Sequence, residues 1–219
     1  MSEDTSPWLL KNLHTGEFEE AQLHHKVLEQ HVNDVEKSWK PILQEQLSKL
    51  KEKHQYGTEK YDHEKLFAEA GELMIQDANW DWKKKYKHLS FTIGYSGCSI
   101  ICGGEIQGLG YFDVSEKYSS RIITEKPTGI VYIKFISSAP WNRKEISNQK
   151  YGGIGIALIT HAIKISIDEG MDGRIGLHSL PQAEGFYKIT CNMKDFGIDD
   201  NNKMRYFEMS QERATEWLS

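Results

Sequence analysis

Cysteine is scarce in this chain of 219 residues, which contains only Cys98, Cys102 and Cys191. Their number is odd, none of their spacings is a metal-binding pair, and a chain of this length can bury a core without disulfide bonds. The thiols are therefore expected to stay reduced and to fill small apolar spaces. The neighbouring His24, His25 and His31 have no Cys or acidic partner at ligand spacing, so we expect no metal cofactor.

Long apolar runs and an excess of basic residues are also missing. No segment approaches the ~20 apolar residues of a membrane span, and residues 1–6 are polar and acidic, unlike a secretion signal. The 32 acidic residues outnumber the 27 Lys and Arg, which gives a formal net charge of -5. Phosphate binding needs a clustered basic excess. We therefore expect a cytoplasmic protein with neither membrane nor nucleic acid as a partner, while a local basic patch remains open.

The first part of the chain is dense in charge and reads as helix over residues 17–78. Within it, Pro41 should end or kink a helix, and residues 56–62 should form a loop because they contain a glycine and no periodicity. Apolar residues that recur at helical spacing are typical of helices that pack on a core. The apolar positions at helical spacing are Phe18, Leu28, Val32, Val35, Trp39, Leu43, Leu47, Leu50, Leu66, Ala70 and Leu73.

From residue 88 the pattern changes to the two-residue period of strands, beginning with Leu89, Phe91, Ile93 and Tyr95. Residues 99–102 and 105–114 predict a hairpin, because a Gly-Gly pair between them supplies the positive φ angles of a tight turn. Glycines in the second strand predict a bulge or a close neighbour there. Residues 126–129 predict a turn, and residues 130–136, apolar except for Lys134, predict a central strand.

The rest of the chain alternates helices and strands. Residues 154–168 predict an apolar helix that Gly170 ends. They are followed by a strand at Ile175 and Leu177, a helix over residues 183–190, a strand over residues 205–209 and a terminal helix. Strands and helices mixed around one sheet make the fold class α/β or α+β.

A glycine-rich loop, Lys150-Tyr151-Gly152-Gly153-Ile154-Gly155, lies between the central strand and this apolar helix. Exposed amides and the helix dipole attract phosphate at such a position. The loop has neither the GxGxxG nor the GxxxxGK[ST] pattern, which weakens dinucleotide and nucleoside-triphosphate hypotheses. Its glycines can also simply permit tight packing of strand on helix.

Residues 131–140 and 150–159 resemble the acetyl-CoA motif of the GNAT superfamily of N-acetyltransferases. Lys150, Gly153 and Gly155 fit that family's loop pattern of Arg or Gln, two residues, Gly, one residue, then Gly or Ala. A second segment, Ala183-Glu184-Gly185-Phe186-Tyr187, is similar to the family's Ala-x-x-Phe-Tyr. Trp80-Asp81-Trp82 and residues 139–143 also resemble a bacterial GNAT subgroup of unknown substrate.

The resemblance implies a central, mixed, mostly antiparallel twisted sheet flanked by helices over residues 88–219, after an N-terminal helical extension over residues 1–87. It implies acetyl-CoA as cosubstrate and an amine, small or peptide, as acceptor. The residues that would contact acetyl-CoA are Ser137, Ser138, Ala139, Lys150, Tyr151, Gly152, Gly153, Ile154, Gly155 and Ile156.

The same resemblance assigns Tyr187 as the acid that protonates the CoA thiolate, and a backbone amide near Ser138 as the oxyanion donor. For the base, His178 has a suitable intrinsic pKa, and Glu184 at the start of the next predicted helix is a second candidate. Either can equally be structural, since a strand His is commonly just hydrogen-bonded and a helix-start Glu favours the helix dipole. Water can relay the proton instead.

Departures from the family pattern keep a second hypothesis open. Leu180 stands where many members have Asn, and Asn192 lies near the position of a usual Gly. The segment between Pro140 and Lys150 is longer than in most members, which suggests an added flap. The alternative is a non-catalytic module that binds a partner protein or senses CoA. The N-terminal extension can cover the sheet, complete the acceptor pocket or form a homodimer, and periodicity does not separate these roles.

Overall fold

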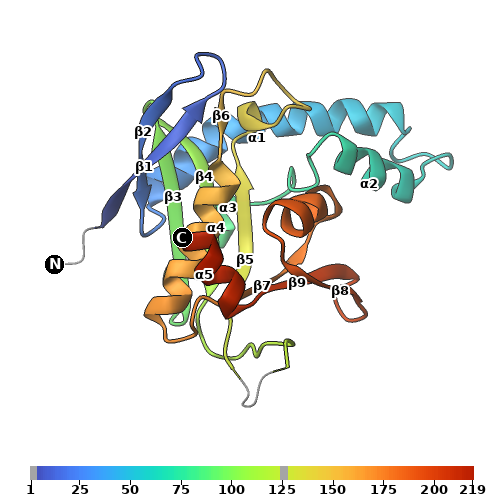
Figure 1. Cartoon of the computed structure of the whole chain (residues 1–219). Helices are drawn as coiled ribbons and strands as arrows, with labels where there is room; N and C mark the ends of the chain where they lie inside the picture. The colour runs from blue at the N-terminus through green and yellow to red at the C-terminus, as the bar shows by residue number, and fades with distance from the viewer. Residues whose placement is uncertain (1–3, 124–127) are drawn as a thin grey trace.

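The computed structural model describes residues 4–123 and 128–219, and one nine-stranded sheet organises them (Figure 1). The strand order is β6-β1-β2-β3-β4-β5-β7-β9-β8. Only β5 and β7 pair in parallel, and all other neighbours are antiparallel, which confirms the predicted mixed sheet. The strands are β1 (Thr5–Asn12), β2 (Phe18–His24), β3 (Tyr95–Cys102), β4 (Glu105–Asp113), β5 (Val131–Ser138), β6 (Tyr151–Gly152), β7 (Ile175–Ser179), β8 (Lys194–Asp199) and β9 (Met204–Met209).

Helices cover both faces of the sheet and enclose two apolar cores. The helices α1 (Glu29–Lys53), α2 (His63–Glu72) and α3 (Trp82–Leu89) share one core with Leu109 and Tyr111 of β4. The helices α4 (Ile154–Asp168) and α5 (Gln211–Leu218) share the other with Phe112. Figure 1 views the sheet from the side of α4. None of the helices in the described part of the chain is long and apolar enough to cross a bilayer.

The helix predicted from residue 17 is wrong over residues 17–24. This segment is β2, which pairs with β1 along its length and with β3 from Ala21 opposite Cys102 to His24 opposite Ser99. Ala21 and Leu23 are buried while Glu20 and Gln22 are exposed, so the charged residues occupy the solvent face of a half-buried strand. The strands of residues 5–24 belong to the same sheet as the rest, and the division of the chain at residue 87 stays a prediction.

The predicted helices over residues 29–73 are confirmed in outline. The helix α1 continues through Pro41 to Lys53 instead of ending there, and it buries Val32, Val35, Trp39, Leu43, Leu47 and Leu50. The strand predicted from residue 88 is wrong, because α3 extends to Leu89 and β3 begins at Tyr95. Phe91 and Ile93, which suggested the strand, are exposed.

The hairpin of β3 and β4 is confirmed, with Gly103 and Gly104 at φ angles of +60° and +75°. The predicted bulge is confirmed too: Ile100 pairs with Gly108 and Ile101 with Ile106, which leaves Gln107 as the extra residue. The predicted turn over residues 126–129 lies partly outside the described residues.

Predictions for the C-terminal part are confirmed except in one helix and one missed strand. The helix α4 has the predicted bounds, and Gly170 follows it at φ +73°. The helix predicted over residues 183–190 is instead a 3-10 turn (Pro181–Ala183) followed by a short π-helix (Phe186–Thr190). The strand β8 had no clear apolar alternation and was not predicted.

Candidate active site

The parallel strands β5 and β7 separate soon after they begin. They pair only at Val131 with Ile175 and at Tyr132 with Gly176. Beyond this point a cavity of about 520 Å³ lies between them. It is lined from the α4 face by Gly155, Phe186 and Tyr187, and from the α1 face by Asp77 and Trp80, so it extends to both faces of the sheet.

A bulge in β5 turns free backbone groups toward this gap. Tyr111 pairs with Phe135 and Phe112 with Ile133, so Lys134 is the extra residue. After the bulge, the Ala139 amide donates to the Gln107 carbonyl at the β4 edge, 2.9 Å away. Because alternate amides of a strand point to opposite edges, the Ser138 amide points to the gap, where a hydrogen-bond donor could meet a ligand oxygen.

The glycine-rich loop places the start of α4 at the same cavity. Gly153, with φ +88°, precedes the helix, and nothing lies within 4 Å of the place where its Cβ would be. The first amides of a helix have no acceptor within it and lie at the positive end of its dipole. Gly153, Ile154 and Gly155 line the cavity, so these amides could hold a phosphate group.

The N-terminal hairpin holds this loop in place. Asn12 of β1 pairs with Tyr151, and the Leu13 amide donates to the Lys150 carbonyl, 2.8 Å away. The Tyr151 hydroxyl donates to the Glu19 carboxylate at 2.6 Å. The strands β1 and β2, which the sequence analysis placed in a helical extension, therefore position the glycine-rich loop that could bind a phosphate.

The structure brings some of the predicted acetyl-CoA contacts together and separates others. Those that line the cavity are Ser137, Ser138, Tyr151, Gly153, Ile154 and Gly155. Lys150 instead pairs with Glu105, with its ammonium 3.1 Å from the carboxylate, and Ala139 is fully buried in the α1-side core. Gly152 pairs with Lys11 in the sheet, and Ile156 is partly exposed outside the cavity.

Tyr187 reaches the cavity from the α4 side. It belongs to the π-helix, and its ring packs 5.9 Å from that of Phe207 between centroids. Burial raises the pKa of Tyr187, so its phenol keeps its proton at neutral pH. Within the described parts of the chain its hydroxyl has no hydrogen-bond partner, which leaves it able to donate to a ligand.

His178 reaches the cavity from the opposite side. Its neighbour Leu177 packs in the α4-side core, and strand alternation turns His178 to the α1 face. Its Nδ1 lies 2.7 Å from the Tyr132 hydroxyl, and its Nε2 lies 3.4 Å from a carboxylate oxygen of Asp199 and 3.1 Å from the amide nitrogen of Asn202. Tyr132 and Asp199 were not predicted, because strand periodicity does not reveal cross-strand partners.

The ionisation states in this chain of groups suit proton acceptance. Burial lowers the pKa of His178, although Asp199 opposes this shift, so the imidazole is neutral at neutral pH. A hydrogen bond from Arg121 lowers the pKa of Asp199, which is therefore ionised. Burial raises the pKa of Tyr132 to about 12.

Glu184, the other candidate base, lies elsewhere. One of its carboxylate oxygens accepts a hydrogen bond from Nε of Arg205 at 2.9 Å, and it does not line the cavity. Of the predicted catalytic residues, the structure thus brings only Tyr187 and His178 to the same cavity.

No family model and no curated protein matches this sequence. Solved structures do match. The GNAT domain of S. lividans PAT is 12% identical over 95% of this chain and 98% of its own, with a TM-score of 0.51.

The chain has the GNAT fold. Two other similar structures are an insect putative arylalkylamine N-acetyltransferase 7 from the yellow fever mosquito and Mycobacterium smegmatis RimJ in complex with CoA-disulfide. The first is 11% identical, covers 94% of this chain and 95% of its own, and has a TM-score of 0.48. The second is 12% identical, covers 98% and 92%, and has a TM-score of 0.47.

One wall of the cavity in this GNAT fold is a buried ion pair that the sequence did not predict. Arg143 donates two hydrogen bonds to the Asp77 carboxylate, at 2.7 and 2.8 Å, and others to the carbonyl oxygens of Met74 and Ser138 and to the Ser137 hydroxyl. Burial acts to raise the pKa of Asp77, but the charge and hydrogen bonds of Arg143 and the hydrogen bond from Ser137 together bring it below its usual value. Residues 141–149, suggested as a flap, thus contribute an anchored wall.

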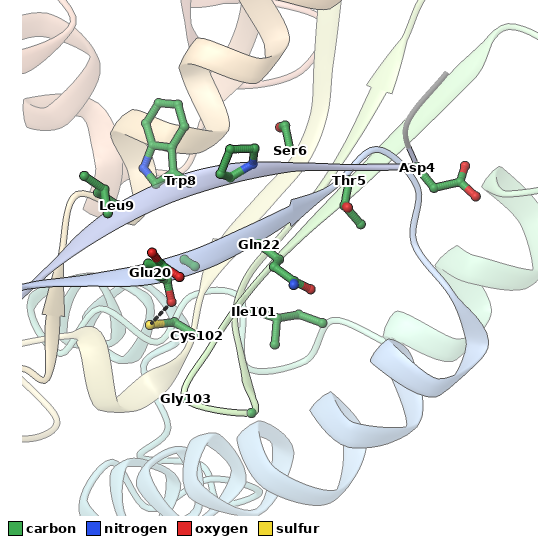
Figure 2. Close-up of a pocket in the computed structure, with 13 residues that line it drawn as sticks. Asp4, Thr5, Ser6, Trp8, Leu9, Glu20, Gln22, Ile101, Cys102 and Gly103 are labelled. Carbon is green, nitrogen blue, oxygen red and sulfur yellow. Dashed lines mark hydrogen bonds between the residues drawn. The ribbon is translucent and has the colours of Figure 1, made fainter. Parts of the chain in front are cut away.

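A larger but more open hollow, of about 1300 Å³, lies over β1, β2 and β3 (Figure 2). Its titratable side chains are Asp4, Glu20 and Cys102, with no cation among the lining residues. The Cys102 thiol donates to the Glu20 carbonyl, and burial raises its pKa, so it is not a reactive thiolate. Among the residues that the structure describes, this hollow offers no cationic side chain that could bind a phosphate.

The histidines near the N-terminus form no recognisable metal site. The rings of His24 and His31 lie 4.9 Å apart between centroids, and His31 Nδ1 bonds to the Ser99 hydroxyl at 2.8 Å. Among the described residues no group of three or more His, Cys, Asp or Glu could hold a metal ion.

Proposed function

We propose that the protein transfers an acetyl group from acetyl-CoA to an amine, either a small molecule or a peptide. A single observation carries this proposal. One cavity joins the free start of α4, the gap between β5 and β7, and the side chains of Tyr187 and His178 on opposite faces of the sheet. The GNAT fold supports the same function by analogy alone, because fold does not determine activity.

The start of α4 would hold the pyrophosphate of acetyl-CoA. Its amides, together with the dipole of an apolar helix, supply positive potential without a charged side chain. Lys150 is engaged by Glu105, so the backbone carries most of this role. The thioester supplies the acetyl group, and the Ser138 amide would stabilise negative charge on its carbonyl oxygen.

His178 would act as the base through the Tyr132 hydroxyl. This role requires the tautomer of His178 that carries its proton on Nε2, beside the Asp199 carboxylate, so that Nδ1 is free to accept. The hydroxyl oxygen then takes a proton from the acceptor ammonium while the hydroxyl proton passes to Nδ1 of His178. The ionised Asp199 beside the other ring nitrogen stabilises the imidazolium that results. Glu184 would have to leave Arg205 to serve as base, so we assign this role to His178.

The neutral amine then attacks the thioester carbonyl. The new C–N bond forms as the C–S bond breaks, and the thiolate leaves with the electron pair. Tyr187 donates its proton to this thiolate, and the proton released by the amine restores the phenol through solvent. The raised pKa of Tyr187 keeps the required proton in place before the reaction.

Binding of acetyl-CoA to two variants of one residue tests the proposal. Gly153→Asp adds a negative charge where the pyrophosphate would bind, and Gly153→Asn adds a side chain of the same shape without charge. Both variants carry the same strain at φ +88° and have open space around the new Cβ. Isothermal titration calorimetry should show acetyl-CoA binding to wild type and Gly153→Asn, with a loss of at least roughly tenfold for Gly153→Asp.

Two outcomes would contradict the proposal. If wild type does not bind acetyl-CoA, the alternative of a non-catalytic interaction module is favoured. If Gly153→Asp and Gly153→Asn bind equally, the start of α4 does not hold the pyrophosphate.

A further inference from the structure

The half of the cavity on the α1 face has aromatic walls. Trp80 and Phe135 line it, with ring centroids 5.0 Å apart in an edge-to-face arrangement. Tyr132 continues this wall toward His178. If acetyl-CoA enters at α4, this half is left for the acceptor, so its side chains should select the amine.

The charged side chains described in the cavity lining carry a net positive charge. Asp77 and Arg143 neutralise each other, and the hydrogen bonds of the guanidinium leave it no free donor for a ligand. Lys134 is the other lysine or arginine among the lining residues, and Asp77 is the only acidic one that the structure describes there. Within the described residues no carboxylate pairs with Lys134.

A second ammonium, that of Lys85, lies against two rings of the same wall. Nζ of Lys85 lies 3.7 Å from the ring centroid of Phe135 and 5.0 Å from that of Trp80. Nζ of Lys134 lies 5.7 Å from the centroid of the Tyr132 ring. Both ammonium groups thus border the aromatic wall.

A simple amine meets repulsion here, because it arrives as a cation at neutral pH, and of the nearby carboxylates that the structure describes Asp77 is paired with Arg143 and Asp199 with Arg121. An amine that also carries a negative group can place that group against Lys134 and bring its nitrogen to Tyr132. The bulge in β5 inserts Lys134 between Ile133 and Phe135, two residues after Tyr132.

We propose that the acceptor is a small amine bearing its own carboxylate or phosphate, that Lys134 binds this anionic group, and that Trp80 and Phe135 contact its apolar part. The proposal rests on the acetyl transfer proposed above. It excludes polyamines and lysine-rich peptides as preferred acceptors, because both add positive charge to a positive wall.

Matched pairs of amines test this inference. Phenylalanine against phenethylamine differs by one carboxylate, and phosphoethanolamine against ethanolamine differs by one phosphate, so the pairs also distinguish the two anions. CoA release should give a kcat/KM at least roughly tenfold higher for the anionic member of one pair. Spermidine is included as a polycationic acceptor and should be acetylated poorly.

Three variants assign the preference to one side chain. Lys134→Met removes the charge but keeps the length, and it should abolish the preference by raising KM for the anionic amine while kcat stays similar. Lys134→Arg should retain the preference, and Lys49→Met, an exposed change on α1, should leave it unchanged. A merely structural role of Lys134 would alter both members of a pair equally.

The inference is overturned if wild type prefers phenethylamine, ethanolamine or spermidine, or if Lys134→Met keeps the anionic preference. It is also overturned if wild type binds acetyl-CoA by calorimetry and acetylates none of the anionic amines. Absence of acetyl-CoA binding would instead show that the proposed acetyl transfer itself is wrong.

Discussion

The hydroxyl of Tyr132 lies 2.7 Å from Nδ1 of His178, where the strands β5 and β7 begin to separate. The pairing of Tyr132 with Gly176 sets this distance, because His178 is two residues further along β7 and on the same face. Asp199 and Asn202 approach the other ring nitrogen. The imidazole therefore has partners at both ring nitrogens, and a proton can pass between the cavity and Nδ1 through the Tyr132 hydroxyl.

We expect the rate of acetyl transfer to depend on pH through His178. The base must be neutral, so kcat/KM should fall as pH falls through the pKa of His178, which burial places below the usual value of about 6.5. Asp199 raises this pKa, so Asp199→Asn should move the acidic limb to lower pH and reduce the maximal rate. His178→Gln should remove the limb, and a limb that survives in this variant assigns the base elsewhere. The measurement is a pH profile of kcat/KM.

Tyr187→Phe should reduce kcat by about 100-fold, the contribution typical of a general acid. The substitution removes one oxygen from a ring that keeps its packing on Phe207, so the affinity for acetyl-CoA should change little. Steady-state kinetics and calorimetry measure the two quantities. Tyr56→Phe, at an exposed tyrosine, is the control. Unchanged turnover in Tyr187→Phe would show that the thiolate takes its proton from another source.

Asp77→Asn should destabilise the fold by about 3–5 kcal/mol, because it leaves the Arg143 guanidinium buried without its counter-charge. Both side chains are 4% exposed, and the asparagine has nearly the same shape. The matched control is Glu45→Gln, which breaks the exposed pair with Lys49 and should cost less than about 1 kcal/mol. Urea unfolding measures both variants. If Asp77→Asn and Glu45→Gln lower the free energy of unfolding equally, water reaches the ion pair of Asp77 and Arg143.

The free energy of unfolding should fall between about pH 6.5 and pH 4. His31 and His161 are buried, and burial lowers the pKa of each to about 4 in the folded state. In this range the unfolded chain binds more protons than the folded one, so the stabilisation present above pH 6.5 is lost as the pH falls. Each histidine can contribute on the order of 1–3 kcal/mol.

Urea unfolding as a function of pH checks this linkage with one variant. His161→Gln should flatten the curve, because Nε2 of His161 has no hydrogen-bond partner among the described residues and its ring packs edge-on against Phe112. His14→Gln, at an exposed histidine, should leave the curve unchanged. Identical slopes in wild type and His161→Gln would show that His161 is not the group that titrates.

The sequence by itself determined the elements whose signals are local. The apolar period and the glycine ends predicted α4 at its observed bounds, and Gly103 and Gly104 predicted the hairpin of β3 and β4. It also predicted Gly153 at the start of a helix, where a phosphate could bind. These signals depend on backbone conformation and burial within a few residues, which the chain encodes directly.

Tertiary structure decided the partners of the site residues. Tyr132 and His178 are 46 residues apart in the chain, and Arg143 and Asp77 are 66 apart. It also made residues 18–24 a strand, because β3 offers an edge that accepts them. Lys150 pairs with Glu105 rather than lining the cavity, because the fold brings these two distant residues together. Which side chains come into contact depends on how distant segments of the chain pack together. The periodicity of the sequence carries no information about such contacts.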